Sequence, residues 1–168
     1  MSRLTGIPLS TWQLTELPYQ VRLLDSIDAC LSHPNESIQE QACEALCELT
    51  CNYFPVGPNG PSDRLQKRVV DQYVHTIKTN ENPASTRGFA LALGYLPHKL
   101  LSPSSKVLDK ILNCLCIVAR YDATVGNEKD AETRRNALIA LRRVCQTVGI
   151  SPSGLNSKQV TQVFNMFF

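Results

Sequence analysis

Three cysteines in the first half of the chain have a spacing that could present thiolates to a metal. Cys43, Cys47 and Cys51 lie four residues apart, so an α-helix would place them in one row. Structural zinc sites need four ligands and usually draw them from turns with spacings of about two to four residues. The nearest histidine, His33, falls in a loop. We therefore expect these thiols to pack in the core or line a groove, with no metal and no cofactor bound.

The other residues that could do chemistry form no catalytic motif. Cys114 and Cys116 are two residues apart in a helical pattern and would point in different directions, whereas Cys145 is a core candidate. His75 has no partner motif, and His98 is expected at a helix junction in a capping or surface role. The sequence contains no GxSxG, HExxH or carboxylate pair beside a nucleophile. We expect no enzyme activity; an enzymatic alternative would require a metal bound at the cysteine row.

Arginines give one predicted helix a basic face. Arg135 and Arg143 are eight residues apart, as are Arg134 and Arg142, so they form two adjacent rows. Arg135, Arg142 and Arg143 could contact an acidic partner or a nucleic-acid backbone, or simply be solvated. The absence of interleaved aromatic residues disfavours stacking of single-stranded nucleic acid.

A structural role between helices is predicted for Arg87, Arg134 and Asp130. We expect Arg87 and Arg134 to brace the turn between paired helices by hydrogen bonds to aspartate and to backbone carbonyls, although direct partner contact stays open. Asp130 precedes Arg134 by four residues, the spacing of an ion pair on a helix.

Length and composition indicate one soluble globular domain. The chain has 168 residues, a formal net charge of +2 and 43% hydrophobic residues. No apolar run approaches the roughly 18–20 residues of a membrane helix, and residues 1–20 lack the apolar centre of a secretory signal. Seven cysteines cannot all pair within the chain, and free thiols are typical of a reducing compartment. The cytoplasm or nucleus is expected.

Helical periodicity separated by Pro, Gly and Asn predicts an all-α fold. No period-two alternation is sustained, so no strand is expected. Six helical patterns and the start of a seventh are predicted: about 18–31, about 36–53, one opening at Ser62 or Asp63 and carrying residues to Ile77, 85–96, one after 102–105 carrying residues 107–118, one carrying residues 137–148, and one from Ser157.

Three of these helices align with one another at a period of about 47–48 residues. With Gln39, Arg87 and Arg134 in register, an alanine follows three residues later in each case, at Ala42, Ala90 and Ala137. Each unit contains a helix, a break and a second helix, which is the length and content of a HEAT or armadillo repeat. We expect a HEAT/armadillo-like helical-repeat solenoid of about three repeats, with an irregular segment at 1–17, repeats at 18–156 and the start of a truncated helix at 157–168.

The stretch "STRGFALALGYLP" is predicted to be the inner helix of the middle repeat. Ala90, Ala92 and Gly94 would let neighbouring helices approach closely, while larger apolar residues fill the gaps. Gly88 and Gly94 each cost about 1 kcal/mol of helix propensity, so this helix is favoured only if others enclose it. A phosphate-binding loop is excluded because there is no GxxxxGK[ST] pattern and no preceding strand.

Three stretches resemble the tubulin-specific chaperone D family, also called tubulin-folding cofactor D. They are "WQLTELPYQVRLLDSIDACLSHPNESIQEQACEAL", "NPASTRGFALALGYLPHKLL" and "DAETRRNALIALRRVCQTVGI", and the resemblance covers about residues 12–164. It implies a cytoplasmic, cytoskeleton-associated helical-repeat chaperone. The implied partners are β-tubulin, cofactors C and E and an ADP-ribosylation-factor-like small GTPase.

The resemblance also implies that GTPase activation occurs only within the cofactor assembly, so no catalytic residue is assigned here. Family members are far longer, and the chain is expected to correspond to an internal part of the later solenoid. Such a piece is expected to be marginally stable or to self-associate through the apolar "VFNMFF". The alternative is a helical-repeat adaptor for nuclear transport or nucleic-acid binding, with steeply salt-dependent binding through Arg135, Arg142 and Arg143. No membrane contact is expected.

Overall fold

The chain is described here by a computed structural model that covers residues 21–54, 56–57, 60–61, 66–101, 105–120, 130–150 and 154–167. The segment expected to be irregular, 1–17, and most of the predicted polar loop, 121–129, lie outside the described residues. The described elements are a helix at 21–31, α2 Glu36–Tyr53, β1 Val56–Gly57, β2 Gly60–Pro61, the π-helical turn η1 Lys67–Asp71, α4 Gln72–Thr79, α5 Pro83–Leu93, α6 His98–Leu101, α7 Ser105–Ala119, α8 Ala131–Val148 and α9 Ser157–Phe167.

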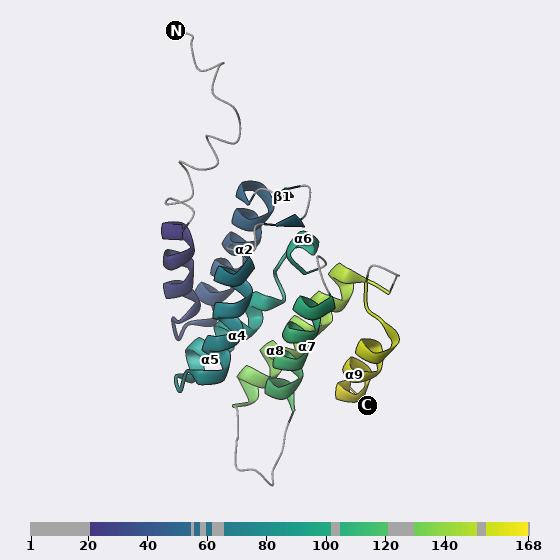
Figure 1. Ribbon diagram of the computed structural model, residues 1–168. Coiled ribbons are helices and arrows are strands. Elements are labelled where there is room, and N and C mark those ends of the chain that lie inside the picture. Colours follow the sequence, from purple (N-terminus) through teal and green to yellow (C-terminus); the bar gives the residue numbers. More distant parts are fainter. Residues whose placement is uncertain are drawn as a thin grey trace, which may run out of the picture.

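The helices stack serially in two layers (Figure 1). We call the layer that contains α2, α5 and α8 the second layer, and the layer that contains α4, α7 and α9 the first layer. In the second layer, α2 packs on α5 and α5 packs on α8. In the first layer, α4 packs on α7 and α7 packs on α9. The hairpins α4–α5 and α7–α8 join the two layers. This arrangement confirms the all-α, helical-repeat fold expected from the sequence, because each unit buries its apolar face on its neighbours.

Three side-chain caps set the start of the second-layer helices. Asn35, Asn82 and Asp130 each accept a hydrogen bond from a backbone N–H in the first turn of the helix that follows. These caps lie 47 and 48 residues apart, as the predicted period requires. Leucines eleven residues after each cap, Leu46, Leu93 and Leu141, are all fully buried. The same hairpin geometry is therefore repeated along the chain.

The caps correct the predicted register of the middle repeat by one residue. Thr86, rather than Arg87, is four residues after its cap, as Gln39 and Arg134 are after theirs. The middle helix also begins at Pro83 instead of Ser85. Proline is compatible with the first helical position because its missing N–H would have no helical partner there. The alanine alignment was therefore misleading by one position.

The predicted third helix is interrupted. Residues 62–65, where it was expected to open, lie outside the described residues. The following turn, η1, is π-helical, since the Gln72 N–H bonds to the carbonyl of Lys67, and both Val69 and Val70 are fully buried. The short helix α6 and the two-residue antiparallel pair β1–β2 were also not expected. Periodicity cannot resolve elements of so few residues.

Two glycines allow the close helix contacts that the sequence predicted for the middle helix. A methyl group at Gly88 would lie 1.9 Å from the carbonyl oxygen of Leu31, and one at Gly94 would lie 2.6 Å from the Cα of Ala140. Any other residue would push α5 away from the helix at 21–31 or from α8. The burial of α5 on both sides thus depends on these positions.

Candidate interaction surface

The exposed part of the second layer comes mainly from its two flanking helices. In α5, every residue from Ala84 to Leu93 is buried except Arg87, which is half-buried. The neighbouring helices α2 and α8 each run for 18 residues, and they project their charged side chains on either side of α5. We call the exposed charged residues of α2 and α8 the charged face.

Four glutamates form a row on α2. Glu36, Glu40, Glu44 and Glu48 are spaced four residues apart and all are exposed. This row was not predicted from the sequence, although its four-residue spacing is as regular as that of the cysteines on the same helix. It gives the α2 side of the charged face a negative charge.

The arginines of α8 do not form a continuous basic surface, because two of them contact side chains from outside α8. Arg135 forms an ion pair with Glu36 that bridges α8 and α2 over the start of α5. The guanidinium of Arg143 stacks on the Tyr95 ring, 3.6 Å from its centroid. Arg142 is exposed and lines a shallow hollow beside α8. The structure therefore brings two of the three arginines against side chains from earlier repeats.

Arg87 joins three repeats at the starts of their helices. Its guanidinium donates to the carbonyl oxygen of Pro34 at 3.1 Å and forms an ion pair with Glu132. Its side chain is only 13% exposed, so these contacts are partly shielded from water. The expected contacts were with aspartate and backbone carbonyls at the turn between paired helices, whereas these contacts join Arg87 to the neighbouring repeats on either side.

Asp130 and Arg134 lie at the start of α8. The carboxylate of Asp130 accepts a hydrogen bond from the Thr133 N–H at 2.6 Å, which makes it the cap of this helix. Arg134 is half-buried and, with Arg142, lines the hollow beside α8. The sequence predicted an ion pair between Asp130 and Arg134; the contact that the structure gives Asp130 is the cap.

The cysteine row does not present three equivalent thiols. Cys43 is buried, Cys47 is half-buried and Cys51 is exposed, with 4.0 Å between the Sγ atoms of Cys47 and Cys51. Burial raises the pKa of Cys43 to about 12 and also raises the pKa of Cys47. Raised pKa values disfavour the thiolate form that metals and electrophiles require. Within the described part of the chain, no group of three or more metal-ligating side chains is found.

Charged residues of both α2 and α8 affect the pKa of Cys43. After burial, the pKa of Cys43 responds to Arg143, which lowers it, and to Glu40 and Glu44, which raise it. The same three charged residues act on the pKa of Tyr95, which burial raises. The two oppositely charged sides of the charged face are therefore within electrostatic range of each other.

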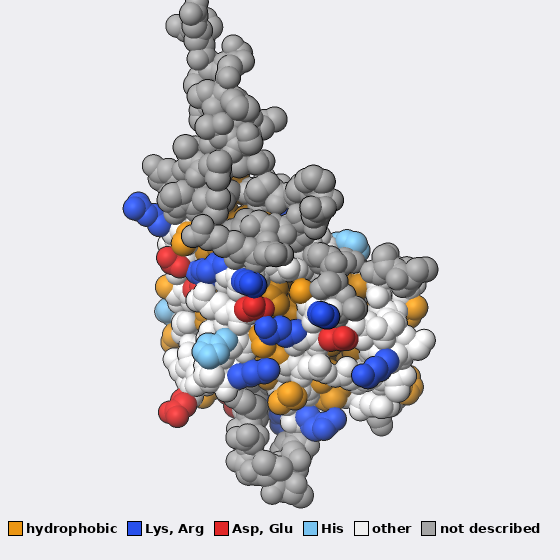
Figure 2. Space-filling view, in the orientation of Figure 1, with side chains coloured by type: hydrophobic (Ala, Val, Ile, Leu, Met, Phe, Trp, Pro, Cys, Tyr) orange, Lys and Arg blue, Asp and Glu red, His pale blue; other side chains and the backbone are white. Residues whose placement is uncertain are grey.

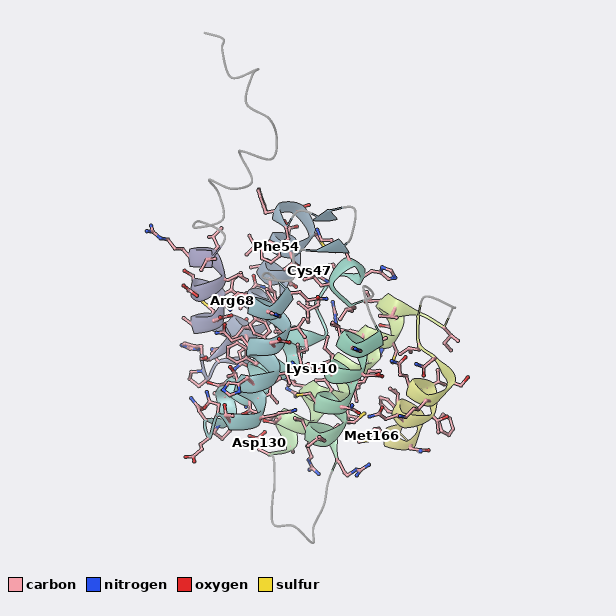
Figure 3. All side chains as sticks on the ribbon, in the orientation of Figure 1. Cys47, Phe54, Arg68, Lys110, Asp130 and Met166 are labelled. Carbon is pink, nitrogen blue, oxygen red and sulfur yellow. The ribbon has the colours of Figure 1, made fainter. Side chains whose placement is uncertain are left out.

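The first layer is joined by its own polar contacts. Arg68, which is labelled in Figure 3, donates to Asp25 at 2.6 Å and to Asp28 at 2.8 Å. The Tyr73 hydroxyl donates to Asp28 at 2.7 Å. Burial alone would lower the pKa of Arg68, but the bonds to Asp25 and Asp28 outweigh it and raise that pKa. This cluster ties the helix at 21–31 to η1 and α4.

Two further contacts continue the series along the first layer. Lys110 of α7 pairs with Asp71 of η1 at 2.8 Å, and Gln159 of α9 donates to Asp109 of α7 at 2.7 Å. Every neighbouring pair in this layer is therefore held by at least one polar bond as well as by apolar packing.

The open hollows among the described residues include the following two. The larger, about 720 Å³, lies between the turn after α4 and the end of α7 and is lined by residues that include Asn80, Pro83 and Ile117. The smaller, about 440 Å³, lies along the side of α8 near the end of α9. No described helix has the length and apolar character needed to cross a membrane.

Comparison with known proteins relates the chain to a curated chaperone. No family model matches the chain, and no solved structure matches it. The curated protein tubulin-specific chaperone D of Dictyostelium discoideum is 30% identical over 122 residues, which is 73% of this chain. The chain spans 8% of the length of that relative. The chain is thus a helical-repeat protein with distant, partial similarity to a short part of a tubulin-specific chaperone D.

Proposed function

We propose that this chain is part of a helical-repeat scaffold that binds β-tubulin during assembly and disassembly of the tubulin heterodimer. Tubulin-folding cofactors C and E and an ADP-ribosylation-factor-like small GTPase are the proposed further partners. The chain itself would have no catalytic activity, and any GTPase activation would arise in the full assembly. Its proposed location is the cytoplasm, in association with the cytoskeleton.

The length of the similarity to tubulin-specific chaperone D carries this proposal. The match extends over 122 residues, whereas one repeat spans only 47 or 48 residues between caps. The similarity therefore includes more than two stacked repeats rather than a single helical hairpin. Because a solenoid binds partners through surfaces that several repeats build together, a shared array supports a shared kind of partner.

The charged face is the proposed contact surface. It combines the exposed glutamates of α2 with the exposed Arg142 of α8, and rows of opposite charge can orient a partner that carries the complementary pattern. The bridge between Arg135 and Glu36 holds the two sides in a defined relation. Charge complementarity of this kind contributes mainly to specificity and to the rate of association.

The proposed function can be tested by capture of tagged β-tubulin from a co-expressing cell. The bait is a protein that contains this chain together with the residues encoded on either side of it. Two forms are compared, the native bait and one that carries both Glu40→Lys and Glu44→Lys. We expect β-tubulin to be retained by the native bait and retained less by the doubly substituted one. Arg22→Glu, an exposed charge change on the helix at 21–31, is the matched control and should leave capture unchanged. The proposal would be rejected if the native bait retained neither β-tubulin nor the small GTPase.

The alternative, a nucleic-acid or nuclear-transport adaptor, has less support. Arg135 and Arg143 are engaged by Glu36 and Tyr95. On the face drawn in Figure 2, Lys and Arg side chains are dispersed among acidic, polar and hydrophobic ones. A phosphate backbone is best bound by a continuous basic surface.

A further inference from the structure

Two cysteines of α2 lie close enough together to react with each other. The Sγ atoms of Cys47 and Cys51 are 4.0 Å apart on consecutive turns of the helix. Cys51 is exposed and Cys47 is half-buried, so a reagent in solution can reach the pair. Both residues belong to the C-terminal half of α2, where Figure 3 labels Cys47. We call Cys47 and Cys51 the thiol pair.

The third cysteine of the row is set apart by burial and not by its spacing. Cys43 precedes Cys47 by four residues, just as Cys47 precedes Cys51. Cys43, however, is fully buried, and burial raises its pKa to about 12. A buried thiol is poorly ionised and out of reach of reagents, so it reacts slowly. The fold therefore distinguishes two cysteine pairs that are equivalent in the sequence.

The end of α2 allows the thiol pair to close into a disulfide. Cβ atoms four residues apart on a helix are about 5–6 Å apart, whereas a disulfide needs about 3.5–4.5 Å, so the turn must tighten. Cys51 lies in the last turn of α2, which ends at Tyr53. Carbonyl groups in a last turn have no helical partner. Here those of Cys51 and Phe54 accept hydrogen bonds from Lys99 Nζ at 2.8 Å and 3.0 Å. The adjustment is thus confined to a helix end.

We propose that the thiol pair is a site of reversible oxidation, at which a low-molecular-weight disulfide such as oxidised glutathione converts Cys47 and Cys51 into a disulfide within the chain. This inference does not rest on the proposed function, because it concerns two thiols of α2 and requires no tubulin. Disulfides that form and break in this way serve redox sensing in reducing compartments.

The reaction consists of two thiol–disulfide exchanges. The exposed Cys51 first loses its proton to water and attacks one sulfur of oxidised glutathione. A bond forms between Cys51 Sγ and that sulfur, and the other glutathione leaves as a thiolate that takes up a proton. Cys47 then loses its proton, attacks Cys51 Sγ and releases the second glutathione in the same way. The two cysteines lose two electrons, which reduce the glutathione disulfide to two thiols.

The position of Cys47 suits the second of these exchanges. Burial raises the pKa of Cys47, Cys51 adds to this effect, and Arg143 opposes it. A raised pKa makes Cys47 a poor first nucleophile, because little thiolate is present. The second exchange is intramolecular, and short connections give effective concentrations of about millimolar or more. Cys51 is therefore the residue that meets the reagent, and Cys47 is the residue that resolves the mixed disulfide.

The test is oxidation of the full 168-residue chain with excess oxidised glutathione, followed by blocking of free thiols with iodoacetamide. Glutamyl endopeptidase cleaves after Glu44 and Glu48, so Cys43, Cys47 and Cys51 are recovered on three different peptides. Mass spectrometry then identifies which peptides are joined. We expect the link between Cys47 and Cys51 to exceed the link between Cys43 and Cys47 by about tenfold or more. Excess reduced glutathione should restore the free thiols.

The unfolded chain and two variants provide the controls. In concentrated urea the two cysteine pairs close loops of equal length, so their yields should agree within about twofold. Cys47→Ser should accumulate a glutathione adduct on Cys51, since nothing resolves it. Cys30→Ser, which removes an exposed thiol on another helix, should leave the link between Cys47 and Cys51 unchanged. Circular dichroism should give equal helicity for the native chain and both variants.

Three results would overturn the inference. The first is equal yield of the two links in the folded chain, because burial would then not select the pair. The second is a native chain that keeps as much glutathione on Cys51 as Cys47→Ser does, because Cys47 would then not resolve the adduct. The third is a link between the Cys51 residues of two chains in place of the link within one chain.

Discussion

A methyl group added to Gly94 would lie 2.6 Å from the Cα of Ala140 and 2.9 Å from its Cβ. Gly94 is the C-terminal cap of α5, and Ala140 is fully buried in α8. At this point α5 and α8 lie so close together that only a glycine fits between them. The backbone of α8 cannot move aside as a flexible side chain could, so the distance between repeats is set here.

Gly94→Ala should therefore destabilise the protein although alanine favours helices. The gain in helix propensity is at most about 1 kcal/mol, whereas overpacking against backbone costs about 1–3 kcal/mol or more. We expect a net loss in the free energy of unfolding, measured by urea denaturation. Gly149→Ala is a useful contrast, since nothing lies within 4 Å of the added methyl group but its φ of 70° is strained. An increase in stability for Gly94→Ala would show that the helices can separate at little cost.

Gln39→Leu should be among the most destabilising substitutions of a polar residue. Gln39 is fully buried, and the two N–H groups of its Nε2 share three acceptors, the carbonyl oxygens of Leu31 at 3.1 Å, His33 at 2.7 Å and Ala84 at 2.8 Å. Leucine has a similar volume but leaves these carbonyls without this donor, at a cost of about 1–3 kcal/mol. Gln41→Leu, on an exposed position of the same helix, should change the unfolding free energy by less than about 0.5 kcal/mol. Equal effects would contradict the bonding seen for Gln39.

The stability of the protein should fall at high pH partly because of Cys43. Its pKa is about 12 in the folded protein and 9.0 ordinarily, because burial disfavours the thiolate. Between these values the folded state binds more protons than the unfolded state, so stability is retained below about pH 9 and decreases as the pH rises toward 12. One such group contributes a slope of at most about 1.4 kcal/mol per pH unit.

The pH dependence of unfolding in urea distinguishes Cys43 from other groups. Burial raises the pKa of Tyr73 as well, so part of the decrease should persist when Cys43 is replaced. Cys43→Ala should flatten the decrease above pH 9, whereas Cys30→Ala, at an exposed position outside the cysteine row of α2, should leave the slope of the decrease unaltered. The same slope in Cys43→Ala and the native chain would exclude Cys43 as a contributor.

The two arginine bridges of the second layer should differ in strength. Arg87 is 13% exposed and also donates to the Pro34 carbonyl, whereas Arg135 and its partner Glu36 are 50% and 47% exposed. Arg87→Ala should cost about 1–3 kcal/mol, and Arg135→Ala should cost at most about 1 kcal/mol because water and salt screen an exposed pair. Urea denaturation at low and high salt tests this. A larger loss for Arg135→Ala would mean that its bridge, and not Arg87, holds the repeats in register.

Much of the fold could be predicted from local pattern. The second and sixth predicted helices correspond to α2 and α8, whose apolar residues recur at helical spacing, and the repeat period of 47–48 residues agrees with the spacing of Asn35, Asn82 and Asp130. The register of the middle helix, α5, was harder to predict. Nearly all of its residues are apolar or small, so no face stands out, and its register was displaced by one residue until the caps and the burial of Leu93 determined it.

The candidate surface was predicted less well. The basic residues of α8 were evident, but the glutamate row of α2 went unnoticed and the contacts of Arg135 with Glu36 could not be foreseen, because the two residues are 99 positions apart. Spacing along a helix reports which residues share a face, and it carries no information on which distant face lies opposite.

By itself, the sequence determined that this protein is a series of helices with a repeated apolar pattern, since periodicity, caps and helix-breaking residues act within a few residues of one another. Only the tertiary structure decided which arginines are engaged and where an apolar side of α8 stays exposed. Those properties depend on the distance and angle between stacked repeats. Contacts such as Gly88 with Leu31 and Gly94 with Ala140 set that geometry only once the chain is folded.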